Sequence, residues 1–199
     1  LGFGASHLWV MEAMGGPRER VRCTTADRLD FDDIHHPVCA ALSVDGSGSP
    51  LPVSSGLLDD FFDHDGQITK RPIRAITLST LAPLPGEHLW DIGAGSGAIG
   101  IEWMLGHPAN RTTAIEHNRE RAARIRHNAD ALGAGHLKLF EGNALEFLSS
   151  ILAKEPPDAV FIGGGLCADL LQVLWQHVPA GTRVVANSVT LETDTLLSK

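Results

Sequence analysis

A glycine-rich turn follows an apolar segment near the middle of this 199-residue chain, in the stretch LWDIGAGSGAIG at residues 89–100. Two overlapping fingerprints of the dinucleotide-binding type begin here, one at Gly93 and the other at Gly95. Glycines at such a turn let the backbone approach a ligand closely, and the N-terminus of the following helix directs free N–H groups towards anionic atoms. The stretch therefore predicts a cofactor site, and the glycine spacing alone does not choose between a pyrophosphate and another charged group.

Polar side chains at the ends of neighbouring apolar segments narrow the choice. Glu116 lies 23 positions after Gly93, where a carboxylate can accept hydrogen bonds from both hydroxyls of a ribose. Asp91 lies two positions before the first glycine, where its charge repels a pyrophosphate but can serve a cationic α-amino group, directly or through water. In EGNA, residues 141–144, the Asn143 side chain and the Ala144 backbone can contact the edge of an adenine. These positions favour an adenosyl group joined to an amino acid.

The elements that must position these residues alternate between strand and helix from about residue 70 onwards. We expect strands at residues 88–92, 111–116, 137–141, 158–163 and 182–188. The clearest helix covers residues 119–132 and ends at Gly133. Another precedes the first strand, with Pro72 in its first turn and one face made by Ile73, Ile76 and Leu81. Strands separated by helices pair in parallel, so the predicted fold class is α/β, a doubly wound, mainly parallel sheet.

The N-terminal quarter has a different pattern. Residues 5–14 have apolar side chains at helical spacing and are followed by two glycines and Pro17, which predicts a short helix. Residues 37–44 predict a buried strand, and residues 45–56, rich in Gly, Ser and Pro, predict a linker. The chain starts at Leu1 in mid-pattern, so we interpret residues 1–44 as the end of a preceding domain and residues 57–199 as the α/β domain.

Composition narrows the function classes further. The net charge of -8 argues against a nucleic-acid partner, and no apolar run reaches the roughly 18 to 20 residues that span a bilayer, so we expect a cytoplasmic protein. The three cysteines are far apart, which predicts free thiols. The acidic segment at residues 59–65 matches no ligand spacing, so no metal site is predicted. We expect the tryptophans at 90, 103 and 175 to lie in the core.

Together, these residues resemble the class I S-adenosylmethionine-dependent methyltransferases, whose first motif places an acidic residue before a GxGxG loop. The resemblance covers residues 69–188 and implies S-adenosylmethionine as the cofactor. An NAD-dependent oxidoreductase and a non-catalytic cofactor-binding module are the alternatives. After the fourth expected strand the sequence reads FIGGG, where members of this class that methylate amines carry a polar motif. Gly163, Gly164 and Gly165 instead leave room for a large flat substrate on the backbone.

A narrower resemblance extends over nearly the whole chain. The stretch from QITKRP to GIEW, followed by AIEHN, EGNA, DAVFIGGG and VVANSVTLE, looks like the C-terminal half of the precorrin-6Y C(5,15)-methyltransferase (decarboxylating) family of cobalamin biosynthesis. Residues 1–44 look like the end of the family's N-terminal tetrapyrrole-methylase domain. The resemblance implies methylation of a precorrin at carbon 15 and loss of carbon dioxide from the ring C acetate. It further implies an N-terminal methyltransferase domain in the same native chain and a possible homotetramer.

The family's cofactor positions can be carried over residue by residue. They fall at Thr69, at the loop Gly93, Ala94, Gly95, Ser96 and Gly97, and at Glu116 and Ala144. Asn143 departs from the more usual aspartate, although its amide can both accept from and donate to an adenine. Because the precorrin substrate is rich in carboxylates while the chain is acidic, we expect cations at the mouth of the site. The candidates are Lys70, Arg71 and Arg74. No catalytic base is assigned, and the final strands of the class are missing.

Overall fold

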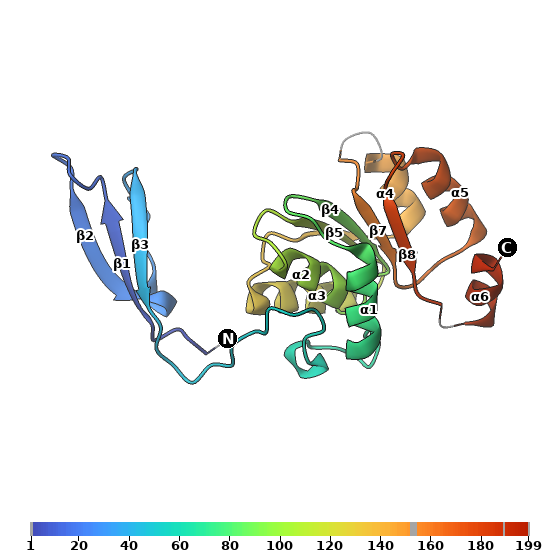
Figure 1. Cartoon of the computed structure of the whole chain (residues 1–199), viewed down its shortest axis with the longest axis horizontal. Helices are drawn as coiled ribbons and strands as arrows, with labels where there is room; N and C mark the ends of the chain where they lie inside the picture. The colour runs from blue at the N-terminus through green and yellow to red at the C-terminus, as the bar shows by residue number, and fades with distance from the viewer. Residues whose placement is uncertain (1, 152–154, 189, 199) are drawn as a thin grey trace. The chain divides into compact units, whose positions relative to one another are not determined.

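The computed structural model, which describes residues 2–151, 155–188 and 190–198, divides the chain into two compact units, residues 1–51 and 52–199 (Figure 1). The boundary falls inside the segment predicted as a linker, where Gly, Ser and Pro are frequent.

The N-terminal unit is a three-stranded antiparallel sheet in the order β2-β1-β3. Its strands are β1 (His7–Glu12), β2 (Arg20–Thr25) and β3 (Val38–Ser43). The strand expected at 37–44 is thus confirmed, but the expectation that it is buried is wrong, because every residue of β3 is exposed. The helix predicted at residues 5–14 is wrong, because His7–Glu12 within this range pair with β2 on one side and β3 on the other. Trp9, Val10 and Met11 suit a strand as well as a helix, and pairing with distant segments decides the outcome.

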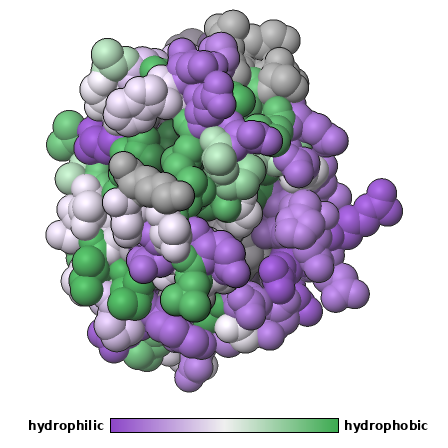
Figure 2. Space-filling model, turned by 90° about the vertical axis from the view of Figure 1, so that its right-hand side faces the viewer, coloured by the Kyte–Doolittle hydropathy of each residue, from purple (hydrophilic) through white to green (hydrophobic). Residues whose placement is uncertain are grey.

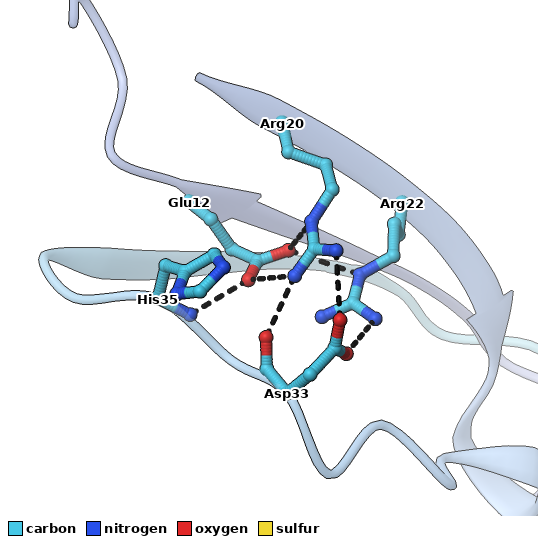
Figure 3. A network of polar contacts seen from close by, with 5 residues as sticks. All are labelled: Glu12, Arg20, Arg22, Asp33 and His35. Carbon is cyan, nitrogen blue, oxygen red and sulfur yellow. Dashed lines mark hydrogen bonds and ion pairs between the residues drawn. The ribbon is translucent and has the colours of Figure 1, made fainter. Parts of the chain in front are cut away.

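A network of charged side chains ties this sheet to the loop before β3 (Figure 3). The carboxylate of Glu12 is buried and accepts hydrogen bonds from Arg20 and Arg22 and from the backbone N–H of His35. Asp33 pairs with both arginines. The neighbouring guanidinium groups, that of Arg20 most strongly, lower the pKa of Glu12 and of Asp33 to about 2. Glu12 is thus kept ionised although its side chain is buried.

The C-terminal unit is built on five parallel strands in the order β6-β5-β4-β7-β8 (Figure 1). These are β4 (His88–Ile92), β5 (Arg111–Glu116), β6 (Lys138–Glu141), β7 (Ala159–Ile162) and β8 (Arg183–Ala186). The chain moves from β4 out to β6, then returns to the other side of β4 to form β7 and β8. This is a doubly wound sheet whose order reverses between β4 and β7, which confirms the predicted fold class and all five predicted strands.

Helices cover both faces of this sheet (Figure 1). They are α1 (Arg71–Leu81), α2 (Ala98–Leu105), α3 (Arg119–Leu132), α4 (Ala144–Ile151), α5 (Ala168–His177) and α6 (Leu191–Leu197). On one face α1, α2 and α3 pack side by side, and α4 packs with α5. Trp90 and Trp103 lie in the core as expected, Trp90 meeting Phe147 edge to face with ring centroids 5.3 Å apart. None of the described helices is long and apolar enough to cross a membrane.

Two expectations about buried faces are wrong. Trp175 is 89% exposed, because Leu170 and Leu174 form the buried face of α5 and the next position points away from it. On α1 the apolar pair Ile73 and Ile76 is exposed, since the buried positions are Arg74, Thr77, Leu78 and Leu81.

Figure 2 views the side of the molecule that carries α5, α6 and β8, and it shows apolar side chains on this surface. Exposed apolar residues of these elements include Val184, Leu191 and Leu197.

Candidate cofactor site

A cavity of about 760 Å³ opens at the carboxyl ends of the parallel strands. In doubly wound sheets this is the edge at which ligands bind, next to the point where the strand order reverses. Six segments supply most of its lining, residues 66–70, 92–96, 115–117, 142–144, 163–165 and 186–188. The volume lies within the range that small-molecule sites occupy.

The glycine loop after β4 forms the floor of this cavity. Gly93, Gly95 and Gly97 have φ values of 69°, 61° and 77°, the left-handed region that other residues rarely adopt. The N–H groups of Gly93 and Ala94 both donate to the carbonyl of Ile115, which fixes the loop against β5. A Cβ at Gly93 would lie 2.7 Å from backbone atoms of Gly164, so glycine is required where the two loops meet. Gly93, Ala94, Gly95 and Ser96 line the cavity, whereas Gly97 is buried against Ile125.

Glu116 lies at the end of β5 and also lines the cavity, although only 2% of the residue is exposed. One carboxylate oxygen accepts from the N–H of Gly95 at 2.9 Å and the other from the N–H of Asn118 at 2.9 Å. Because each oxygen has a second lone pair, the carboxylate can still accept from two further hydroxyl groups. Glu116 therefore orients the glycine loop and keeps the capacity to bind a ribose diol.

Asp91 lies behind the glycine loop and not in the cavity wall. Its side chain is buried in the middle of β4, where Oδ2 accepts from the N–H of Gly100 at 3.0 Å. Oδ1 has no hydrogen-bond partner among the described residues. Burial, with a smaller contribution from the nearby charge of Glu116, raises the pKa of Asp91 to about 7. Of the two modes expected from the sequence, direct contact with a ligand is wrong for this structure, in which Asp91 lies outside the lining and braces the start of α2, while contact through water stays a prediction.

The ends of β6 and β7, which lie on either side of β5 and β4 in the sheet, supply two further parts of the lining. Asn143 is exposed, and its Oδ1 accepts from the N–H of Leu145 at 2.8 Å, which fixes the side chain at the start of α4. Asn143 and Ala144 both line the cavity, as do the glycines 163–165. A Cβ at Gly163 would lie 2.9 Å from the Phe161 ring, so this loop runs close to the sheet.

The three candidate cations differ in their exposure and in their hydrogen-bond partners. Lys70 is exposed and lines the cavity beside Thr69. Arg71 lies outside the lining and donates from Nε to the carbonyl of Gly56 at 2.8 Å. Arg74 is fully buried, with an ion pair to Glu102 at 2.5 Å and another to Asp59 at 3.0 Å. The expectation that Arg74 faces a substrate is wrong, because its charge is committed to this internal network.

Several lining residues were not expected from the sequence. His117 and Arg121 line the cavity from the turn after β5 and the start of α3, and Asn187 and Ser188 line it after β8. Asn187 and Ser188 were not expected because the predicted strand, 182–188, included them. The observed β8 ends at Ala186, so both residues lie beyond the end of the strand. In the described part of the chain, no group of three His, Cys, Asp or Glu side chains is arranged to hold a metal ion.

Comparison with known proteins places this geometry in a family. Residues 60–199 match the sequence model of a protein family described as the precorrin methyltransferase domain. The precorrin-6Y C(5,15)-methyltransferase [decarboxylating] of Sinorhizobium sp is 46% identical over 98% of this chain and 48% of its own length. A probable cobalt-precorrin-6B C(15)-methyltransferase (decarboxylating) of Saccharolobus solfataricus is 33% identical, over 71% of this chain and 73% of its own length.

A solved structure gives the same result in three dimensions. The C-terminal domain of precorrin-6Y C5,15-methyltransferase from Rhodobacter capsulatus superposes with a TM-score of 0.69 at 44% identity, covering 74% of this chain and 78% of that one. The chain spans about half the length of the Sinorhizobium relative. By sequence and by fold, the chain belongs to the precorrin methyltransferase family.

Proposed function

We propose that this chain binds S-adenosylmethionine in the cavity and methylates a precorrin at carbon 15, with loss of carbon dioxide from the ring C acetate, in cobalamin biosynthesis. The observation that carries the proposal is the convergence of the glycine loop, Glu116 and residues 142–144 on one cavity at successive strand ends. The family match and the activities for which the relatives are named supply the reaction.

The cavity offers suitable residues for each part of the proposed cofactor. Glu116 would hold the ribose and Asn143 with Ala144 the adenine, while Thr69 and the glycine loop would hold the methionine end. Glu116 lies directly against the loop, where its carboxylate accepts from the N–H of Gly95 at 2.9 Å, and so sets a negative field there. Such a field favours a cationic sulfonium and α-amino group and disfavours a pyrophosphate. This is the physical reason to prefer S-adenosylmethionine over NAD.

For the substrate, we propose that the macrocycle lies over the loop at 163–165. These glycines line the cavity with no side chain to obstruct a flat ligand, and Phe161 lies beneath them. Lys70, which lines the cavity, would meet substrate carboxylates at the mouth and offset the net charge of -8. Arg71, which is exposed and follows it outside the lining, is the second candidate.

The chemistry proposed needs little acid–base help. When bound, S-adenosylmethionine supplies a methyl group on a sulfonium, which an electron-rich ring carbon can displace. The contribution of the protein is to align the two reactants and to exclude water. The conjugated macrocycle can accept the electrons released when carbon dioxide leaves, so we assign no catalytic base and no metal to this step.

We extend the proposal to the setting of the domain. Residues 1–44 would close a preceding tetrapyrrole-methylase domain, residues 45–56 would link it to the methyltransferase domain at residues 57–199, and the whole would act in the cytoplasm, with a homotetramer as the assembly to test. Curated relatives twice as long as the matched region support the two-domain arrangement.

Calorimetry with S-adenosylhomocysteine and, separately, with NAD tests the proposed cofactor. We expect saturable binding of S-adenosylhomocysteine and none of NAD. Binding of NAD alone would instead support an oxidoreductase. Binding of S-adenosylhomocysteine without any turnover of a precorrin would support a non-catalytic module.

A further inference from the structure

One buried amide connects two walls of the cavity. Asn128 lies on α3 and is only 1% exposed. Its Nδ2 donates to the carbonyl of Ser96 and to the carbonyl of Asp63, both at 2.9 Å, and its Oδ1 accepts from the N–H of Asp63 at 2.8 Å. Both amide hydrogens and one acceptor site are therefore in use. The side chain is held by the backbone of two segments that are 33 positions apart in the sequence.

Those two segments lie side by side and both line the cofactor cavity. Ser96 belongs to the glycine loop, and Asp63 begins a segment, residues 63–70, which we call the strap. Residues 66–70 of the strap line the cavity together with residues 93–96 of the loop. A Cβ at Gly95 would lie only 3.3 Å from the carbonyl oxygen of Gln67, so the strap passes directly over the loop. A shift of the strap therefore changes the space available to a ligand.

The ion pairs that also hold the Asp63 end of the strap lie nearer to solvent. Arg121 pairs with Asp65 at 2.8 Å, and Arg124 reaches Asp65 at 3.3 Å and Asp63 at 3.9 Å. These side chains are all partly exposed, so their ion pairs are screened by water and salt and stabilise the strap only weakly. The hydrogen bonds of Asn128 are buried, and a carbonyl that loses its partner there is not resolvated at low cost. Asn128 is thus the buried anchor of the Asp63 end of the strap, while at the other end buried Arg74 donates to the carbonyl of Thr69.

We propose that Asn128 is a positioning residue that holds the strap against the glycine loop, and so gives the cavity the shape that S-adenosylmethionine requires. The inference rests on the proposed function, because it assumes that the ligand occupies the cavity that both segments line. Asn128 does not line the cavity and acts through Ser96 and Asp63.

The variant Asn128→Asp tests this role with little change in shape. Aspartate keeps the acceptor for the N–H of Asp63 but loses both donors and turns a carboxylate towards two carbonyl oxygens. A matched control is Asn110→Asp. Asn110 is also 1% exposed, donates to the carbonyl of Trp103 at 3.0 Å and accepts from the N–H of Gly86 at 2.8 Å, but it lies at the opposite end of β5 from the cavity.

Both variants should unfold at lower denaturant concentration than the wild type, whereas only Asn128→Asp should lose ligand affinity. We expect its dissociation constant for S-adenosylhomocysteine to rise about tenfold or more, with Asn110→Asp within about twofold of wild type. In turnover assays the KM for S-adenosylmethionine should rise more than kcat falls, because Asn128 does not touch the reacting atoms. If Asn128→Asp does not fold, Asn128→Ala, which introduces no charge, replaces it.

Hydrogen exchange of the wild-type protein gives a second test, which needs no variant. The N–H of Asp63 donates to Asn128 and the N–H of Gly86 donates to Asn110, each at 2.8 Å. S-adenosylhomocysteine should slow hydrogen exchange at Asp63 and leave Gly86 unchanged.

Equal affinities of the two variants, or equal exchange responses at the two amides, would overturn the role of Asn128 while leaving the cofactor assignment intact. A wild-type protein that binds no S-adenosylhomocysteine would overturn both.

Discussion

The buried carboxyl group of Asp91 should make the stability of this protein depend on pH in an unusual direction. In the folded chain, burial raises its pKa from the ordinary 3.8 to about 7. Between these two values the folded protein holds a proton that the unfolded chain has released. The free energy of unfolding contributed by this group therefore falls as pH rises, and the loss is complete above about pH 7.

The variant Asp91→Asn isolates this contribution because its amide does not titrate. At about 1.4 kcal/mol per pH unit, the interval from 3.8 to about 7 corresponds to about 4 kcal/mol. We therefore expect the variant to gain about 4 kcal/mol relative to wild type between pH 3.5 and pH 8, whatever the constant effect of replacing the side chain. The comparison between pH values cancels that constant effect.

Urea denaturation of ligand-free protein at a series of pH values measures the difference. The exposed Asp60→Asn, which also removes one carboxylate, is the control and should stay within about 0.5 kcal/mol of wild type. A difference between Asp91→Asn and wild type that does not change with pH would refute the reasoning, since it would mean that the pKa of Asp91 is the same in the folded and the unfolded protein.

Three further predictions concern the buried ion pair of Arg74, the glycine loop and the carboxylate of Glu116. Glu102→Gln should lower the free energy of unfolding by about 3 to 5 kcal/mol in urea denaturation, because it leaves the buried guanidinium of Arg74 without its closest counter-charge. Gly93→Ala should abolish measurable calorimetric binding of S-adenosylhomocysteine, since its Cβ would lie 2.7 Å from Gly164 at a φ of 69°; unchanged binding would show that the two loops can separate freely. Glu116→Ala removes hydrogen bonds to a charged group worth roughly 1.5 to 3 kcal/mol, so the same titration should show affinity about 10- to 150-fold weaker.

The sequence predicts the C-terminal unit well because its signals are local. Asn118 caps α3 by accepting from the N–H groups of Glu120 and Arg121, and Gly133 ends it with a φ of 83°. The predicted range 119–132 is therefore the observed one. By contrast, β1 was predicted as a helix, because apolar residues at residues 5–14 satisfy either period and only the partners β2 and β3 decide between them.

The same distinction explains which site residues could be found. The glycine loop, Glu116 and Asn143 follow directly after strands, so their place at the carboxyl edge of the sheet follows from the strand prediction. Arg74 could not be assigned in this way, because its partner Glu102 lies 28 positions away on another helix. Asn128 lies inside a helix with a regular pattern, and nothing in the sequence distinguishes it from an ordinary polar position.

Incubation of the protein with S-adenosylmethionine and a precorrin-6Y-type substrate, followed by mass spectrometry of the tetrapyrrole, tests the central claim most directly. The proposed function predicts a product that has gained one methyl group and lost one carbon dioxide, formed only when S-adenosylmethionine is present. A tetrapyrrole of unchanged mass, from protein that binds both ligands, would contradict it.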